Sequence, residues 1–175
     1  MLKVGVFVDI SNLYFTVKKK FQGQKLDYLK FLQQCTGGHK LVHAFAYGAQ
    51  EDDQANTFIS CLKNFGYSPK FKRPKLVAPN VKKADWDVGI TIDVIRFLPR
   101  LDVVVIGSSD SDFAPLVSYC QSQGSKVHVW GALISRELKN AADTYHEIGE
   151  SLLHANGAEE SQSSSVPPDK SGDPT

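Results

Sequence analysis

The feature that most constrains the fold is a set of short apolar runs that contain almost no polar residue. Residues 101–106 read LDVVVI, residues 3–8 read KVGVFV, and residues 41–47 read LVHAFAY. A strand with one face in water alternates apolar and polar residues, so runs this continuous predict strands buried on both faces. Segments with helical spacing separate the runs. This alternation predicts an α/β fold, a three-layer α/β/α sandwich with a mainly parallel central sheet.

Other elements follow from side-chain spacing and from turn residues. Residues 51–65 have apolar side chains at helical spacing and Gly66 where a C-cap belongs, so we predict a helix there. Pro69 cannot donate a hydrogen bond in a central strand, so the strand expected at 67–71 belongs at a sheet edge. Further helices are predicted directly after the first strand and for residues 26–34, 112–123 and 136–142, and further strands for residues 126–130 and 145–148.

Residues 84–98 fit two structures. Apolar and polar residues alternate strictly over the first part of the segment, as in a strand, whereas its length favours a helix ended by Pro99. In a helix Asp87 and Asp93 point about 120° apart and cannot share one metal ion, while in a strand they would lie on one face. We predict a helix, with a buried face formed by Val88, Ile92, Ile95, Phe97 and Leu98.

The composition bears on the number of domains and on the compartment. With 175 residues and 42% hydrophobic content the chain can bury a core without disulfides, and we expect one domain over residues 1–153. Residues 154–175 are polar and rich in Ser, Pro and Gly, so we expect a disordered tail there. The three cysteines are scattered and never form C-x-x-C, which suits a cytoplasmic protein. No stretch approaches the roughly 18 consecutive apolar residues of a membrane span, so no membrane partner is expected.

Charge is distributed unevenly along the chain. The formal net charge is only +1, yet residues 70–83 contain six basic residues and no acidic one. A basic stretch near clustered aspartates is expected where a polyanion approaches a bound cation. The alternative is an ordinary solvated loop rich in lysine.

Short polar side chains follow two of the predicted strands. Asp9 comes directly after the first strand, and Asp110 and Asp112 follow the run at 101–106. In open α/β sheets ligands bind outside the carboxyl ends of the strands, so we expect these carboxylates to lie close together. Aspartate is also a favoured helix N-cap, and capping is the alternative for each of them. Clustered carboxylates repel unless a cation or a proton lies between them, and oxygen ligands favour Mg²⁺ or Mn²⁺.

Missing motifs exclude other kinds of site. The chain has neither G-x-G-x-x-G nor G-x-x-x-x-G-K-[ST], so no nucleotide cofactor is expected. An aspartyl-phosphate phosphatase would need D-x-D where residues 9–11 read DIS. The serines around Asp110 have no G-x-S-x-G elbow, and His43 and His128 lie inside apolar strands and are interpreted as structural. A metal ion that supports phosphodiester hydrolysis needs no nucleophilic side chain.

Four segments together closely resemble the successive motifs of the NYN family, the LabA-like branch of the PIN-like nucleases. They are FVDISNLY at 7–14, KADWDVGITID at 83–93, VVVIGSSDSDFAPLV at 103–117, and GSKVHVWG at 124–131 followed by LKNAAD. Their order and spacing match over roughly residues 1–150, a combination far more specific than any single motif. The resemblance implies a PIN-like, Rossmannoid sandwich that acts as a metal-dependent ribonuclease.

The resemblance also implies roles for individual residues. The expected catalytic residues and metal ligands are Asp9, Asp87, Asp110 and Asp112. Asn12 corresponds to the asparagine that accompanies the first metal aspartate, and we expect it to position the scissile phosphate. Asp93 matches a second aspartate of this branch and is expected to support the ligands. The other residues expected to contact RNA, from the serines beside Asp110 and from the basic stretch, are Ser108, Ser111, Lys72, Arg73, Lys75, Lys82 and Lys83.

Two departures from the family pattern leave alternatives open. Ser109 stands where the family usually has glycine, so its side chain would either crowd a tight turn or add a hydroxyl near the metal. Residues 83–86, KADW, replace the commoner Lys-Gly before the helix. One alternative to a ribonuclease is a PIN-like module that binds RNA or a protein partner without cutting. The other is a nuclease that acts on DNA, because phosphate contacts do not distinguish the two nucleic acids.

Overall fold

A computed structural model describes residues 1–50, 55–78 and 81–155. The strands are β1 (Lys3–Asp9), β2 (Lys40–Ala49), β3 (Ser68–Lys72), β4 (Lys75–Ala78), β5 (Val81–Lys83), β6 (Val103–Gly107), β7 (Lys126–Gly131) and β8 (Thr144–Glu147). The α-helices are α1 (Ile10–Lys20), α2 (Tyr28–Thr36), α3 (Ala55–Phe65), α4 (Asp87–Phe97), α5 (Ala114–Ser122) and α6 (Arg136–Ala141). Short 3₁₀ helices are η1 (Leu98–Arg100), η2 (Ser111–Phe113) and η3 (Glu150–Leu152).

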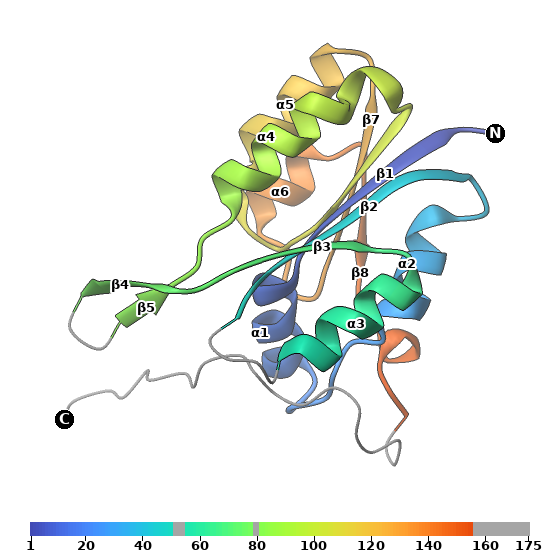
Figure 1. The fold of residues 1–175 in the computed structure, drawn as a ribbon. Helices are drawn as coiled ribbons and strands as arrows, with labels where there is room; N and C mark the ends of the chain where they lie inside the picture. Colours follow the sequence, from blue (N-terminus) through green and yellow to red (C-terminus); the bar gives the residue numbers. More distant parts are fainter. Residues whose placement is uncertain (51–54, 79–80, 156–175) are drawn as a thin grey trace.

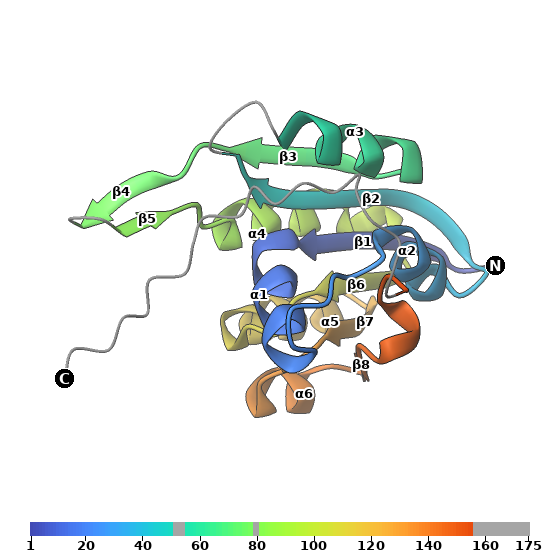
Figure 2. The ribbon, with the colours of Figure 1, turned by 90° about the horizontal axis from the view of Figure 1, so that it is seen from below.

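The main sheet has the strand order β3-β2-β1-β6-β7-β8, and every neighbouring pair is parallel. Helices α1, α2 and α3 cover one face, and α4, α5 and α6 cover the other (Figures 1 and 2). The predicted α/β/α sandwich is confirmed, and its six-stranded sheet is entirely parallel. The strand that contains Pro69 lies at the sheet edge, as predicted.

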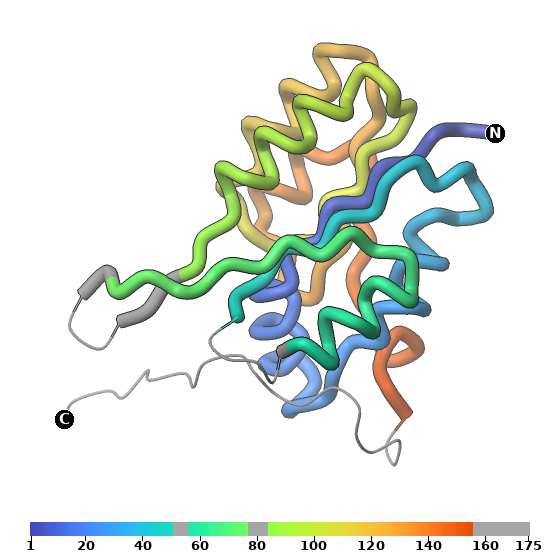
Figure 3. The backbone as a smooth tube through the Cα atoms, viewed as in Figure 1, coloured from blue at the N-terminus to red at the C-terminus, as the bar shows by residue number. Residues whose placement is uncertain are grey.

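Burial on both faces explains the continuous apolar runs. Along β1, Val4, Val6 and Val8 pack with α1, α2 and α3, whereas Phe7 packs with the helices of the opposite face. None of these four side chains is more than 1% exposed. Figure 3 shows how the second half of the chain returns to place β6 beside β1 in the middle of the sheet. The two most buried strands therefore end side by side.

Residues 84–98 contain a helix, which confirms the prediction made from the length of the segment: α4 begins at Asp87. The predicted buried face is wrong for Val88, Ile92 and Ile95, whereas Leu98 is buried and Phe97 packs against the core, as predicted. The side chains that face solvent are Val88, Ile92 and Ile95, at 73%, 50% and 42% exposure. The helix packs on the sheet through Ile90 and Val94 instead, and Asp93 is also buried. Strict alternation gives this helix apolar residues on two sides, and only one side meets the sheet.

The helix predicted for residues 112–123 begins as the 3₁₀ helix η2 and continues as α5. Pro115 has no N–H to donate to the carbonyl of Ser111, so a regular α-turn cannot form there. The remaining predicted helices and strands are confirmed where the structure describes them, with ends shifted by a few residues. The 3₁₀ helix comes shortly after β6; Asp110 is its N-cap residue, and Asp112 lies within it.

Part of the basic stretch forms an antiparallel hairpin, β4–β5, which was not predicted. Figure 2 shows this hairpin projecting from the body of the molecule between β3 and α4. Of the predicted tail, residues 156–175 lie outside the described residues. Within the described ranges, no helix is long and apolar enough to cross a membrane.

Candidate metal centre

The candidate site lies where β1 and β6 end. These strands pair in parallel with Val8 beside Gly107, so Asp9 and the residues from Ser108 to Asp110 emerge at the same edge of the sheet. This is the location that the sequence predicted, because the carboxyl ends of parallel strands define the ligand crevice of such a sheet.

Asp9 and Asp110 both cap helices, which was the alternative prediction for them. Oδ1 of Asp9 accepts the N–H of Asn12 at 3.0 Å, at the start of α1. Oδ1 of Asp110 accepts the N–H of Asp112 at 3.0 Å, at the start of η2. Capping does not exclude metal binding, because each carboxylate has a second oxygen with its own lone pairs. The caps also fix the orientation of both carboxylates.

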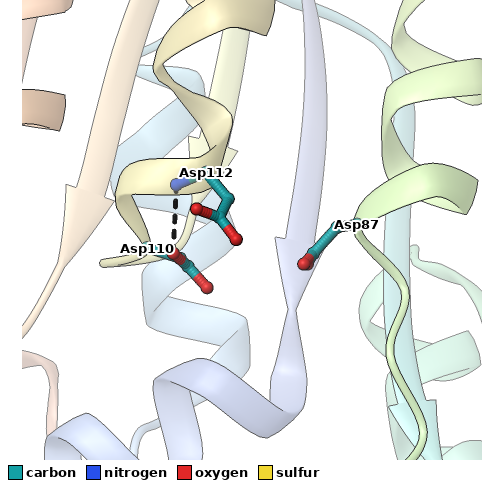
Figure 4. A group of neighbouring side chains, drawn as sticks. All are labelled: Asp87, Asp110 and Asp112. Atoms are coloured by element: carbon teal, nitrogen blue, oxygen red, sulfur yellow. Dashed lines mark hydrogen bonds between the residues drawn. The ribbon is translucent and has the colours of Figure 1, made fainter.

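Three carboxylates from two separate segments meet at this edge (Figure 4). Carboxylate oxygens of Asp87, Asp110 and Asp112 all lie within 4.8 Å of one another. Asp110 is the N-cap residue of η2 and Asp112 lies within η2, and Asp87 faces them from the first position of α4. Adjacent ligands of a Mg²⁺ ion lie roughly 3 Å apart, so small side-chain rotations would bring these oxygens to coordinating distance.

Asp9 lies beside this group. Burial raises the pKa of the Asp9 carboxyl to about 6, although the N–H of Asn12 lowers it, and the charges of Asp110 and Asp85 raise it further. The Asp9 carboxylate is therefore close enough to Asp110 for the two charges to repel each other.

Asp85 is a site residue that the sequence reasoning missed. The pKa of Asp87 is raised to about 7. Burial is the largest cause, and the hydrogen bond with Asp85 and the charges of Asp85, Asp9 and Asp110 raise it further. Asp85 also accepts the N–H of Asp87 on Oδ1 at 3.0 Å. The signal that could have found it is D-x-D at 85–87, the same spacing as at 110–112.

Asn12 connects the two strand ends that form the site. Its Oδ1 accepts the N–H of Ser109 at 2.8 Å, which holds the segment leading to Asp110 against the start of α1. The sequence predicted that Asn12 contacts substrate. The structure gives its carbonyl oxygen an internal partner, and its amide Nδ2 remains a donor group.

The three serines near Asp110 differ in their surroundings. Ser108 is fully buried, and its Oγ accepts the N–H of Asp110 at 3.2 Å, so it shapes the turn. Ser111 is half-buried in η2. The Ser109 Oγ accepts the N–H of Leu133 at 3.3 Å and would lie 2.5 Å from a Cβ placed at Gly131. The missing side chain at residue 131 therefore accommodates the departure from the family pattern at residue 109.

Asp93 lies on the buried side of α4, away from the carboxylate group. Its Oδ2 accepts hydrogen bonds from the Tyr47 hydroxyl at 2.9 Å and from Lys70 Nζ at 2.6 Å, and its Oδ1 lies 3.3 Å from Arg96 Nη1. These contacts tie α4 to β2 and β3. The separation of Asp93 from Asp87 follows from the helix, as predicted.

The predicted basic contacts have different surroundings. Arg73 and Lys75 are exposed. Lys72 is half-buried, donates from Nζ to the carbonyl of Asp85, and lies 4.4 Å from the centre of a Trp86 ring. The predicted contacts through the side chains of Lys82 and Lys83 fall outside the described part of the chain.

The donor set fits a hard divalent cation. All the converging groups are carboxylates, which are the ligands that Mg²⁺ and Mn²⁺ prefer. The raised pKa values of Asp9 and Asp87 reflect burial together with mutual repulsion, which a cation between the carboxylates would relieve. Asp112 is exposed, so the group can be reached from solvent.

An all-parallel α/β/α sandwich with aspartates gathered at the carboxyl ends of its central strands has the architecture of the PIN-like class. The NYN domain family model matches residues 3–151 of the chain. The protein therefore belongs to the NYN domain family, a PIN-like nuclease family.

Two relatives are similar over most of their length. The chain is 24% identical over 159 residues to the low amplitude and bright protein LabA of Synechococcus elongatus, a match that covers 85% of this chain and 84% of LabA. It is 32% identical to VPA0982, a Vibrio parahaemolyticus protein of unknown function. The crystal structure of that protein matches with a TM-score of 0.80, over 87% of this chain and 96% of the other. The family suggests that the protein binds nucleic acid.

Proposed function

We propose that this protein is a metal-dependent ribonuclease that hydrolyses phosphodiester bonds at the group formed by Asp87, Asp110 and Asp112. One observation carries the proposal: carboxylate oxygens from two segments far apart in the sequence lie within 4.8 Å of one another. Membership of a PIN-like nuclease family supports the same chemistry.

Each carboxylate has a role that follows from its position. Asp87 and Asp110 would hold Mg²⁺ or Mn²⁺, with Asp9 as a further ligand or a neighbouring charge. When bound, such an ion supplies a polarised phosphoryl oxygen and a stabilised leaving oxygen. Asp112 is exposed and would orient the attacking water or hold a second ion. The Nδ2 group of Asn12 is a donor suited to a phosphate oxygen.

RNA as the substrate is supported by the family and by the basic hairpin. Exposed Arg73 and Lys75 lie between β3 and the start of α4, the helix that begins with Asp87. They would contact the phosphates of a bound strand, a role that the sequence also predicts for Lys82 and Lys83. Contacts of this kind give an affinity that falls as salt rises.

The test is cleavage of end-labelled RNA, single-stranded and structured, by the full-length protein with Mn²⁺, with EDTA, and as Asp110→Asn. We expect cleavage only with metal and a loss of at least about a hundredfold in the variant. Asp102→Asn is the matched control, because Asp102 is an exposed aspartate at the opposite end of β6 that accepts the N–H of Lys3. Its activity should equal that of the wild type.

Three outcomes separate the alternatives. Cleavage that persists in EDTA and in Asp110→Asn would contradict the proposal. RNA binding without any metal-dependent cleavage would identify a binding module that does not cut. Faster cleavage of DNA than of RNA of the same sequence would identify a nuclease with the other substrate.

A further inference from the structure

The segment between β3 and α4 leaves the body of the molecule and returns to it. β3 ends at Lys72, the hairpin β4–β5 projects outward, and α4 begins at Asp87 (Figure 2). The base of the hairpin is therefore formed by the last residue of β3 and by the residues that precede α4. A contact across this base would fix where α4 starts.

Lys72 makes that contact. Its Nζ donates a hydrogen bond to the backbone carbonyl of Asp85 and lies 4.4 Å from the centre of a Trp86 ring. The ammonium group therefore has an oxygen acceptor and an aromatic face at once, an arrangement that stabilises a cation. A phosphate bound by Lys72 would have to compete with both partners.

Trp86 is held in turn by β2 and by α4. Its Nε1 donates to the carbonyl of Gly48 at 2.8 Å, and its ring lies 5.4 Å from that of Tyr47. Gly89 leaves room for the indole, since a Cβ there would lie 2.7 Å from a ring carbon of Trp86. The indole thus fits between the end of β2 and the first turn of α4.

These contacts determine the position of Asp87. Trp86 is the N-cap residue of α4 and makes no side-chain capping bond, so the start of the helix depends on its neighbours. Asp87, at the start of α4, faces Asp110 and Asp112 across the site (Figure 4). Functional side chains must be held within about 0.5 Å to bind well, and a shift of α4 would move Asp87 out of the group.

We propose that Lys72 and Trp86 are positioning residues, which hold Asp87 in the metal centre by closing the base of the hairpin. Lys72 is then not one of the phosphate contacts predicted from the basic stretch. The inference rests on the proposed metal site. It divides the basic residues into two groups: Lys72 acts on metal binding, and exposed Lys75 acts on nucleic acid.

The experiment compares Lys72→Met with Lys75→Met in the full-length protein. Methionine keeps an unbranched stem and removes the charge and the donors. Mn²⁺ affinity is measured in the absence of RNA, by titrating the protein with Mn²⁺ and following the electron paramagnetic resonance signal of the unbound ion. RNA affinity is measured in EDTA, where no metal contributes. For Lys72→Met we expect Mn²⁺ affinity about tenfold weaker, in the range found when groups behind metal ligands are removed, with unchanged RNA affinity.

Lys75→Met should give the opposite result: unchanged Mn²⁺ affinity, weaker RNA binding, and a salt dependence whose slope falls by about 1. Lys72→Arg, which keeps the charge and a donor, should restore Mn²⁺ affinity to within about threefold of the wild type. Trp86→Phe, which loses the bond to Gly48, should weaken Mn²⁺ binding as Lys72→Met does. This variant serves as the test if circular dichroism shows that Lys72→Met does not fold.

Two failures can be told apart. A wild-type protein that binds no Mn²⁺ would refute the proposed metal site, and this inference with it. A wild-type protein that binds Mn²⁺, with Lys72→Met binding it equally and RNA less tightly, would leave the metal site standing. Lys72 would then be a phosphate contact and the positioning role would be refuted.

Discussion

At the scale of the residue, Asp9 combines a structural bond with an electrostatic cost. Its Oδ1 caps α1, while its burial and the charges of Asp110 and Asp85 oppose ionisation and raise its pKa to about 6. Asp87 is raised further, to about 7. Without metal, the folded chain therefore holds these protons more tightly than the unfolded chain does.

The first prediction concerns stability against pH in EDTA. Since the folded pKa of Asp9 is about 6 and its ordinary value is 3.8, the folded state binds more protons between these pH values. The contribution of Asp9 to the free energy of unfolding thus falls as pH rises from about 4 to 6, by at most about 3 kcal/mol. Asp9→Asn removes this penalty and keeps an oxygen that accepts from Asn12. In urea titrations, we expect the free energy of unfolding of the variant, relative to that of the wild type, to increase as pH rises from 5 to 8.

Comparison with the variant is needed because two histidines act in the opposite direction. Burial lowers the pKa of His128 and His146, so their contribution to stability grows as pH rises. That contribution is common to both proteins and cancels in the difference, which reports Asp9 together with the change in the Asp87 pKa that follows loss of the Asp9 charge. A difference that stays constant from pH 5 to 8 would show that the Asp9 carboxyl titrates normally.

The second prediction concerns Ser109 and Gly131. A Cβ at residue 131 would lie 2.5 Å from Ser109 Oγ and 2.8 Å from Ile134 Cγ1, so Gly131→Ala should lower the free energy of unfolding by about 1–3 kcal/mol. Adding Ser109→Gly removes one of these clashes and should recover part of the loss. A double-mutant cycle in denaturant measures this coupling. Additive effects of the two substitutions would contradict the packing described for Ser109.

At the scale of the element, α4 packs on the sheet through one buried face, and its first residue, Asp87, belongs to the candidate metal centre. Ile90 and Val94 are 1% and 0% exposed against the sheet, and Asp93 is tied to Tyr47 and Lys70 on the same side. The opposite side carries exposed Ile92. Packing on the sheet and the contacts at its first turn together fix the helix that presents Asp87.

The third prediction compares the two sides of this helix. Ile90→Ala leaves a cavity in a closed core and should cost about 2–5 kcal/mol of stability. Ile92→Ala removes a side chain that is 50% exposed and should cost less than about 1 kcal/mol. Both substitutions lose the same atoms and gain the same helix propensity, so chemical denaturation of the pair isolates burial. Equal costs would place the two residues in similar surroundings.

The strands were predictable and the buried side of α4 was not, for a physical reason. Burial of β1 and β6 on both faces requires nearly continuous apolar sequence, which leaves an unambiguous pattern. In α4 the alternating sequence offers apolar side chains at Val88 and Ile92 as well as at Ile90, and the choice depends on the sheet. The hairpin strands have four and three residues, too few to show a period.

The residues of the candidate site were likewise predictable only in part from local sequence. Asp9 and Asp110 were predicted because strand ends and their caps are local features of the sequence. Asp87 required the family resemblance, since it reaches the group only through the packing of α4. The contact of Lys72 was missed because its acceptor is the backbone carbonyl of Asp85, and a backbone acceptor leaves no mark in the sequence.

At the scale of the whole molecule, the sheet holds together a group of charges that destabilises the fold. Asp9 and Asp110 follow the two central strands, and Asp87 is brought opposite them by a helix on one face. Because these side chains repel one another, the arrangement persists through packing elsewhere. A cation would convert this repulsion into attraction, so metal binding and folding stability are linked.

The fourth prediction uses this linkage. Mn²⁺ at about a hundred times its dissociation constant should add roughly 2.7 kcal/mol to stability and raise Tm by about 5–10 °C for a chain of this size. Asp110→Asn has two effects of opposite sign. In EDTA the variant should melt above the wild type, because one of the repelling charges is gone while an oxygen still accepts from Asp112. With Mn²⁺ it should gain little, because a ligand is gone.

Thermal unfolding in both conditions checks this crossover, and Asp102→Asn again serves as the control. That variant loses a carboxylate outside the group and should keep the full Mn²⁺ shift. A general loss of packing in Asp110→Asn would lower Tm in both conditions, and a metal bound elsewhere would leave the shift intact. A higher Tm than the wild type in EDTA, together with a smaller rise in Tm on adding Mn²⁺, is expected only if Asp110 repels its neighbours in the metal-free protein and binds the ion in the metal-loaded protein.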